Sequence, residues 1–224
     1  MATLTETQIL GIVYSLKEGD DDGWDVTSEE YLSGRKYCNA AIARWEYYDN
    51  TKWRELWTTL TAAADGDKTT DGTNVYDCPT NFRFPSSWVR INDVHYEVVT
   101  PNRLAELSDS DAYFCYFSGS DKDGHKLNIN PRIALGTGDT IEYEYYKSAS
   151  TFTTTTSTTE MSNPYFIVNS VLSQFIKLDG EDNIQELQQA DEFLEQMKID
   201  NESGFFGVPD PLNETISNNS GFGE

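Results

Sequence analysis

Two histidines are the first residues to consider for chemistry, because histidine exchanges protons near neutral pH. His95 falls in a predicted strand beside Tyr96, and His125 follows a glycine-containing turn. Neither has a second histidine or a glutamate at the helical spacing of a zinc site, and the chain has no G-x-S-x-G nucleophile motif. It also lacks the glycine-rich Lys-Ser/Thr loop that cradles phosphates. We therefore expect both histidines to be ordinary surface or sheet residues, without a catalytic role.

Two aspartate-rich loops could bind a metal ion. Residues 20–25 read Asp-Asp-Asp-Gly-Trp-Asp, and residues 121–124 read Asp-Lys-Asp-Gly. Trp24 stands at the fifth position of the first loop, where an EF-hand needs an oxygen ligand, and the second loop is shorter still. Carboxylate pairs elsewhere do not indicate a glycosidase, because chance pairs are frequent in so acidic a chain. We expect solvated turns, with no catalytic, metal or cofactor site.

Three cysteines, Cys38, Cys78 and Cys115, are widely spaced and form no C-x-x-C pair. This pattern indicates neither a disulfide framework nor a zinc site, so we expect reduced, buried thiols. Residues 1–7 lack the positive start and apolar core of a signal peptide, and no apolar run could span a membrane. We expect a protein made in a cytosol, with no membrane partner.

Length, composition and charge limit the number of domains and the kinds of binding partner. The 224 residues, 38% of them hydrophobic and 13% aromatic, can bury the core of one large domain or of a domain with an insertion. With 38 acidic and 16 basic residues, the formal net charge is −22. This balance disfavours binding to the outside of DNA or RNA, which depends on Lys and Arg. A like-charged wall would instead let DNA slide past.

Helical signals dominate the two ends of the chain. Thr3 with Glu6 fits a capping box, and apolar residues then recur at helical spacing. Asn163 and Pro164 have the chemistry of a helix start. The predicted helices cover about residues 3–19, 27–49, 53–64, 165–178 and 181–199.

The middle of the chain changes to a period of two after the turn-forming residues 65–72. Asn92 and Asp93 predict a hairpin, and Ile141, Tyr143 and Tyr145 alternate with glutamates along one strand. Short strands with tight turns indicate an antiparallel sandwich or barrel. The predicted strands are Val75–Cys78, Trp88–Ile91, Val94–Val99, Ala112–Phe117, Leu127–Ile129, Arg132–Leu135 and Thr140–Tyr146.

These patterns predict an α+β protein in which both chain ends form one helical bundle. The bundle is assigned to residues 1–66 and 160–200, and the antiparallel β insertion to residues 67–159. Residues 151–159, nearly all threonine, are expected to form an extended strap or edge strand. Residues 201–224, rich in Gly, Asn, Ser and Pro, are expected to form an extended C-terminal arm.

The serial order of these features resembles a known family. The features are the helix segment at 37–45 with Asn39 and Ala41, the Pro-Thr-Asn-Phe step at 79–82, the segments 88–91, 124–129, 131–135 and 141–146, the threonine-rich bridge into Asn163-Pro164-Tyr165, and the acidic helix pair. Over roughly residues 5–200, this order resembles the head-to-tail adaptor (connector) proteins of tailed bacteriophages, in particular the tail-tubular-A-like adaptors of short-tailed phages. The long tail after Asn201 departs from that pattern.

This resemblance implies a structural virion protein of the phage neck without enzymatic activity. Such adaptors form a closed homo-oligomeric ring, commonly of twelve copies, between the portal protein and the downstream tail or nozzle protein. The ring lines the channel through which DNA passes, without specific binding, during packaging, retention and ejection. About twelve copies would carry a formal charge on the order of −260, which would keep DNA from adhering to the wall.

Apolar residues spaced along the C-terminal arm are the predicted contacts with the portal or a neighbouring subunit. They are Phe205, Phe206, Val208, Leu212, Ile216 and Phe222. The alternative is a carbohydrate- or receptor-binding module of a tail spike or baseplate, suggested by the Tyr and Trp residues of the β segment. The amphipathic helices argue against that alternative, because such a module would not require a bundle.

Overall fold

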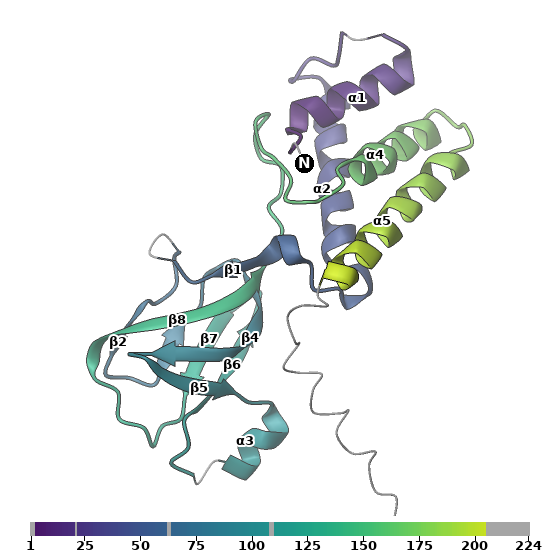
Figure 1. Ribbon diagram of the computed structural model, residues 1–224. Helices are drawn as coiled ribbons and strands as arrows, with labels where there is room; N and C mark the ends of the chain where they lie inside the picture. The colour runs from purple at the N-terminus through teal and green to yellow at the C-terminus, as the bar shows by residue number, and fades with distance from the viewer. Residues whose placement is uncertain (1–2, 21, 62–63, 108–109, 205–224) are drawn as a thin grey trace, which may run out of the picture. The chain divides into compact units, whose positions relative to one another are not determined.

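The computed structural model describes residues 3–20, 22–61, 64–107 and 110–204. The chain divides into two compact units, with boundaries between Leu56 and Trp57 and between Ser148 and Ala149. We call the parts before and after these boundaries the helical unit, and residues 57–148 the sheet unit. Five α-helices and one curled half-barrel sheet are present in the described residues, so the predicted mixed α+β class is confirmed (Figure 1).

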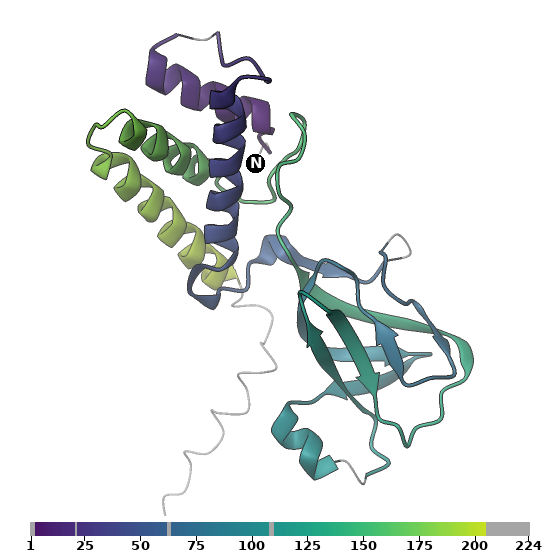
Figure 2. The ribbon, with the colours of Figure 1, turned by 180° about the vertical axis from the view of Figure 1, so that it is seen from behind.

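The helical unit is organised around one helix that is apolar on most of its surface. This helix, α4, packs against the other three, lying beside α5 while α2 runs across it (Figures 1 and 2). A helix that is hydrophobic nearly all round is stable only where neighbours cover it. The elements of the unit are α1 (Glu6–Glu18), α2 (Glu29–Glu46), η1 (Tyr48–Asn50), η2 (Arg54–Leu56), α4 (Tyr165–Leu178) and α5 (Ile184–Gly204).

The first helix is capped two residues later than the sequence predicts. Thr5 is the N-cap: its hydroxyl accepts a hydrogen bond from the Gln8 backbone N–H, and the Gln8 side chain accepts one from the Thr5 N–H. The predicted capping box of Thr3 and Glu6 is therefore wrong. Glu6 is fully buried and binds Arg35 of α2, so its carboxylate is not available for capping.

The last helix is longer than the sequence predicts, because α5 continues through Gly204. Asn201 is buried on it; its side-chain oxygen accepts a hydrogen bond from the Arg54 N–H (2.8 Å), and its side-chain nitrogen donates one to the Lys52 carbonyl (3.0 Å). These bonds hold the helix end against the chain before η2. The prediction of an extended arm is thus wrong for residues 201–204, and residues 205–224 lie outside the described residues.

The threonine-rich segment runs as a strap along the helical unit. Phe152 is buried there, and Asn39 of α2 both donates to its carbonyl (3.1 Å) and accepts from its N–H (2.7 Å). Thr158 forms an isolated antiparallel bridge with Thr5 at the start of α1. The strap therefore satisfies backbone groups at the first turn of α1 that lack partners within the helix.

The sheet unit contains eight strands in the described residues, all in one sheet. The order is β1-β8-β4-β5-β6-β7-β3, with β2 also paired to β8. A two-sheet sandwich is not confirmed. The elements are β1 (Trp57–Thr59), β2 (Thr69–Asp71), β3 (Val75–Asp77), β4 (Phe82–Ile91), β5 (Val94–Val98), α3 (Pro101–Leu107), β6 (Phe114–Ser120), β7 (Gly124–Ile129) and β8 (Thr137–Lys147).

Two local predictions for the sheet are confirmed. Asn92 and Asp93 both have positive φ (48° and 64°) and join β4 to β5 as a two-residue hairpin. Along β8, Ile141, Tyr143 and Tyr145 are buried while the glutamates between them are less so. Both features depend on residues adjacent in sequence.

The pairing of β5 with β6 contradicts the expectation of a wholly antiparallel sheet. These strands run parallel, with Glu97 opposite Phe114 and Val98 opposite Cys115. The chain leaves β5 through α3 before it enters β6. A parallel pair needs such a crossover, whereas a tight turn would give an antiparallel pair.

Two predicted elements are absent from the structure. The predicted strand at 132–135 is irregular, because the fully buried Asn130 accepts a hydrogen bond from the Arg132 N–H and forms a local turn. The predicted helix at 53–64 ends as a short 3-10 turn, and Trp57 then begins β1 opposite Tyr146. The β-branched residues Thr58 and Thr59 favour that extended conformation.

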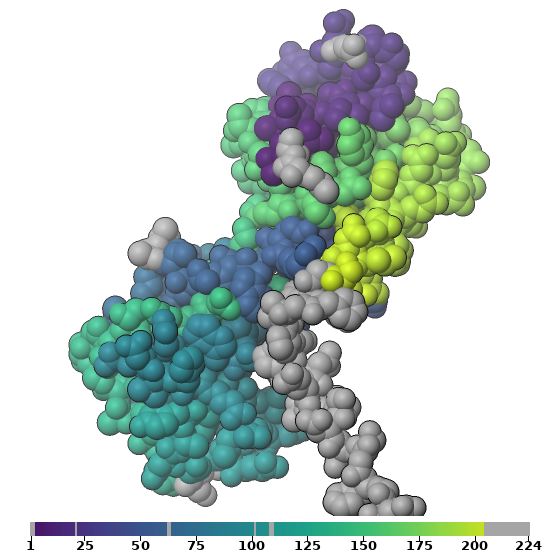
Figure 3. All heavy atoms as spheres, in the orientation of Figure 1, coloured from purple at the N-terminus to yellow at the C-terminus, as the bar shows by residue number. Residues whose placement is uncertain are grey.

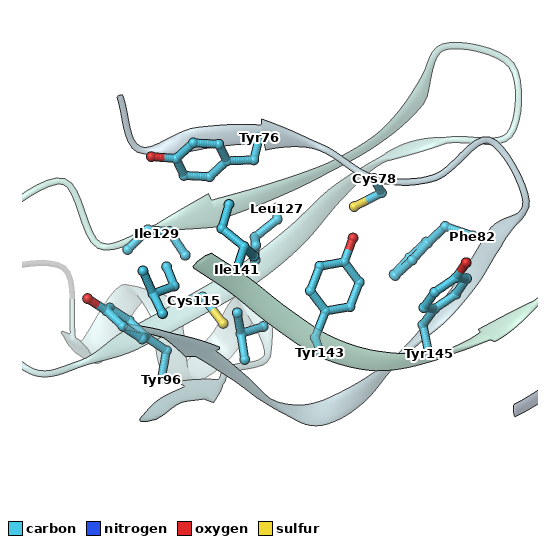
Figure 4. Packing of buried hydrophobic residues seen from close by; sticks show 12 residues of the cluster. Tyr76, Cys78, Phe82, Tyr96, Cys115, Leu127, Ile129, Ile141, Tyr143 and Tyr145 are labelled. Carbon is cyan, nitrogen blue, oxygen red and sulfur yellow. The ribbon is translucent and has the colours of Figure 1, made fainter. Parts of the chain in front are cut away.

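An aromatic and aliphatic core fills the concave side of the sheet (Figure 4). Phe82 lies at one end of this core (Figure 4), stacked on Phe117 (ring centroids 5.0 Å apart) and on Tyr145 (5.5 Å). The Tyr143 hydroxyl points toward Cys78 (Figure 4). The core therefore joins strands from the beginning and the end of the unit.

Candidate functional site

A shallow hollow of about 320 Å³ on the sheet unit brings together the residues most capable of chemistry. Its lining includes His125 and four aspartates, Asp65, Asp77, Asp121 and Asp123. A ring nitrogen of His125 lies 2.9 Å from the Asp121 carboxylate, four residues earlier on the β6–β7 turn. A carboxylate in this position can orient an imidazole for proton transfer. The pair was not predicted, although the close sequence spacing of its members is a signal for it.

Two other aspartates of the hollow are bound to neighbouring groups. The carboxylate of Asp65 accepts hydrogen bonds from the Thr80 N–H (2.9 Å) and hydroxyl (2.5 Å), and Asp77 is paired with Lys126. Burial raises the pKa of the neighbouring Cys78 thiol to about 12. That thiol is therefore protonated at neutral pH, and a thiol is a much weaker nucleophile than a thiolate.

His95 lies apart from this hollow in the sheet unit. It is exposed on β5, with its ring 5.7 Å from that of Trp88 on β4. The structure thus does not bring the two histidines into one site. The predicted contact residues Phe205, Phe206, Val208, Leu212, Ile216 and Phe222 lie outside the described residues.

The described aspartates of the loop at 20–25 support the local backbone. The Asp20 carboxylate accepts a hydrogen bond from the Asp22 N–H (3.1 Å). The Asp25 carboxylate accepts from the hydroxyl (2.6 Å) and N–H (2.7 Å) of Thr27, and these bonds lower its pKa. Across residues 3–20, 22–61, 64–107 and 110–204, no group of three or more His, Cys, Asp and Glu side chains is placed to hold a metal ion.

All three thiols should resist alkylation in the folded protein. Cys38 and Cys115 are fully buried, Cys78 is 8% exposed, and burial raises the pKa of each. We expect less than about a tenth of the thiols to react with iodoacetamide at mildly alkaline pH, and all three to react in denaturant. Mass spectrometry of the alkylated protein would measure this, and rapid labelling of native Cys38 or Cys115 would contradict the described cores.

Large apolar side chains are exposed on the helical unit. Leu16 on α1 is 59% exposed, Leu178 at the end of α4 65%, and Ile199 on α5 55%. Figure 3 shows both α1 and α5 at the surface of this unit. Single exposed apolar side chains are ordinary on a protein surface, whereas contiguous groups of them mark places where another molecule binds.

Acidic residues are unevenly divided between the two units. Residues 1–56 and 149–204 carry 21 acidic and 8 basic side chains, a formal charge of −13, whereas residues 57–148 carry 14 and 8, a charge of −6. The helical unit is thus the more acidic of the two. In the part of the chain that the structure describes, no helix is long and apolar enough to cross a bilayer.

The comparisons with known proteins assign no family. No protein-family model matches the chain, and a search of the curated proteins finds no matching sequence.

Proposed function

We propose that this protein is a structural head-to-tail adaptor of a tailed bacteriophage, a ring subunit located in the virion neck and without catalytic activity. In this proposal the helices from both chain ends act as one bundle that forms the body of the subunit. The ring contacts the portal protein on one side and a tail or nozzle protein on the other. DNA passes through its acidic channel without specific binding.

The exposed apolar side chains of the helical unit carry this proposal. Leu16 and Ile199 remain largely uncovered in the single chain, and burying them against neighbouring copies would stabilise a ring. The serial order of sequence features from the Asn39 helix to the acidic helix pair supports the same assignment. The His125–Asp121 pair does not favour a cysteine nucleophile, because burial raises the pKa of the nearby Cys78 thiol.

Ring formation can be tested directly. We expect the purified protein, mixed with its portal, to form closed rings of about twelve copies with a central hole in negative-stain micrographs. Ile199→Asp should weaken assembly at least about tenfold, because a charge would replace an exposed apolar contact. Mass photometry would measure the assembled fraction, and circular dichroism would show that the variant subunit is folded.

Truncation of the chain after Gly204 tests the predicted contacts of the C-terminal arm with the portal. The truncated chain keeps the whole of α5, including the buried Asn201. If the residues beyond Gly204 contact the portal, this chain should fold normally and lose portal binding. Monomers that bind glycans and ignore the portal would contradict the adaptor proposal and favour the carbohydrate-binding alternative.

A further inference from the structure

A partly exposed aromatic patch lies at one end of the helical unit. The ring of Trp24, in the α1–α2 connection, lies 5.3 Å from Tyr14 of α1 and 4.8 Å from Phe175 of α4. Tyr37 of α2 contacts the same Phe175 at 5.5 Å. Phe175 is buried beneath the other rings, which are half-buried. Leu178, 65% exposed, lies one turn beyond Phe175 on the same side of α4. We call these five residues the aromatic patch.

Acidic side chains surround the aromatic patch. Lys17 joins the ends of α1 and α4 there, with its Nζ 2.7 Å from Glu18 and 3.1 Å from Asp179, and the two helix ends lie on the same side of the unit in Figures 1 and 2. Desolvation, and next the charge of Asp20, raise the pKa of the Tyr14 hydroxyl. Seven exposed acids neighbour the patch in sequence, against three basic residues, Lys17, Lys36 and Lys177: Glu18, Asp20, Asp22, Asp25, Asp179, Glu181 and Asp182.

We propose that the aromatic patch is a docking site for a basic amphipathic segment of another protein. Apolar side chains of that segment would cover Leu178 and the Trp24 ring, while its Lys or Arg side chains would pair with the surrounding carboxylates. Cations also bind favourably over the faces of Trp and Tyr rings. The patch thus offers both kinds of contact that such a segment needs.

A second copy of this chain does not provide the required charge. Its basic residues are scattered, and the only adjacent pair in the sequence is Arg35 and Lys36. Arg35 is already bound to the buried Glu6 carboxylate. The occupant is therefore a different, basic protein. This inference does not depend on ring assembly, since the patch belongs to a single subunit.

A labelled helical peptide of leucine and lysine tests the proposal on the full-length protein. We expect the fluorescence anisotropy of the peptide to report micromolar binding, whereas a matched leucine–glutamate peptide should bind at least about a hundredfold more weakly. Leu178→Ser should weaken binding of the leucine–lysine peptide at least about tenfold. Because Leu178 is mostly exposed, this change should leave the fold intact.

Leu16→Ser is the matched control for the docking site. Leu16 is also an exposed leucine of the helical unit, at 59%, but lies two residues from Tyr14 and so about 200° around α1 from it. The Leu16→Ser protein should bind the leucine–lysine peptide with the affinity of the unchanged protein. Equal affinities for the Leu178→Ser and Leu16→Ser proteins would overturn the proposal, because binding would then reflect net charge alone. Absence of binding, or equal binding of the leucine–glutamate peptide, would overturn it as well.

Discussion

Replacing Arg35 with methionine should destabilise the helical unit by about 3–5 kcal/mol, because it would leave the Glu6 carboxylate buried without a partner. Glu6 has no exposed surface, and the Arg35 Nε donates to both of its oxygens, at 2.8 and 3.0 Å. The Glu6 backbone N–H also donates to the Ser157 carbonyl of the strap (2.8 Å). Loss of the ion pair should therefore loosen the strap along with α1 and α2.

The double variant Glu6→Gln with Arg35→Met separates the buried charge from the lost packing. Without a charge to desolvate, it should recover at least about half of the lost stability. Urea unfolding followed by far-ultraviolet circular dichroism would measure the free energy of unfolding of each protein. If Arg35→Met costs less than about 1 kcal/mol, the carboxylate is hydrated and the described burial of Glu6 is wrong.

Replacing Phe82 with alanine should destabilise the sheet unit by about 3–5 kcal/mol, because the change removes a large ring from a close-packed core. Phe82 is 2% exposed and stacks on Phe117 and Tyr145, with Tyr143 and His125 also within ring contact. The lost ring contacts two strands that are far apart in sequence, β6 and β8. The cavity would therefore weaken the closure of the curled sheet.

Val94→Ala provides the control in the same unit. Val94 is 40% exposed at the end of the β4–β5 hairpin, so its truncation should change the free energy of unfolding by no more than about 0.5 kcal/mol. Urea unfolding followed by near-ultraviolet circular dichroism would report the aromatic core. Similar losses of stability for the two variants would show that the Phe82 ring is not closely packed in the core.

Both variants also bear on assembly, because a ring subunit must keep its shape while it binds neighbours. Glu6 and Phe82, the groups at issue in these two variants, are buried, whereas Leu178 and Ile199 are exposed. A loss of assembly in Ile199→Asp at unchanged stability would consequently indicate a direct contact. A loss that accompanies unfolding of the helical unit would indicate only that the subunit no longer folds.

The sequence by itself determined the elements whose signals are local. The alternation of Ile141, Tyr143 and Tyr145 predicts the buried face of β8, and Asn92-Asp93 predicts the β4–β5 hairpin. The apolar residues after Pro164 predict α4 with its observed limits. The period of the buried side chains and the dihedral angles of a turn depend on residues only a few positions apart. The sequence therefore predicts these features without information about tertiary contacts.

Only the tertiary structure decided where several of these elements end and what they bind. Asn201 extends α5 by binding the chain at Lys52 and Arg54, about 150 residues away. The parallel β5–β6 pair and the contacts of Trp24 with Tyr14 and Phe175 likewise join separate parts of the chain. Such contacts form only when the intervening chain closes as a loop and other groups exclude water. These contacts are therefore stable only within the packed unit, and no pattern of neighbouring residues in the sequence predicts them.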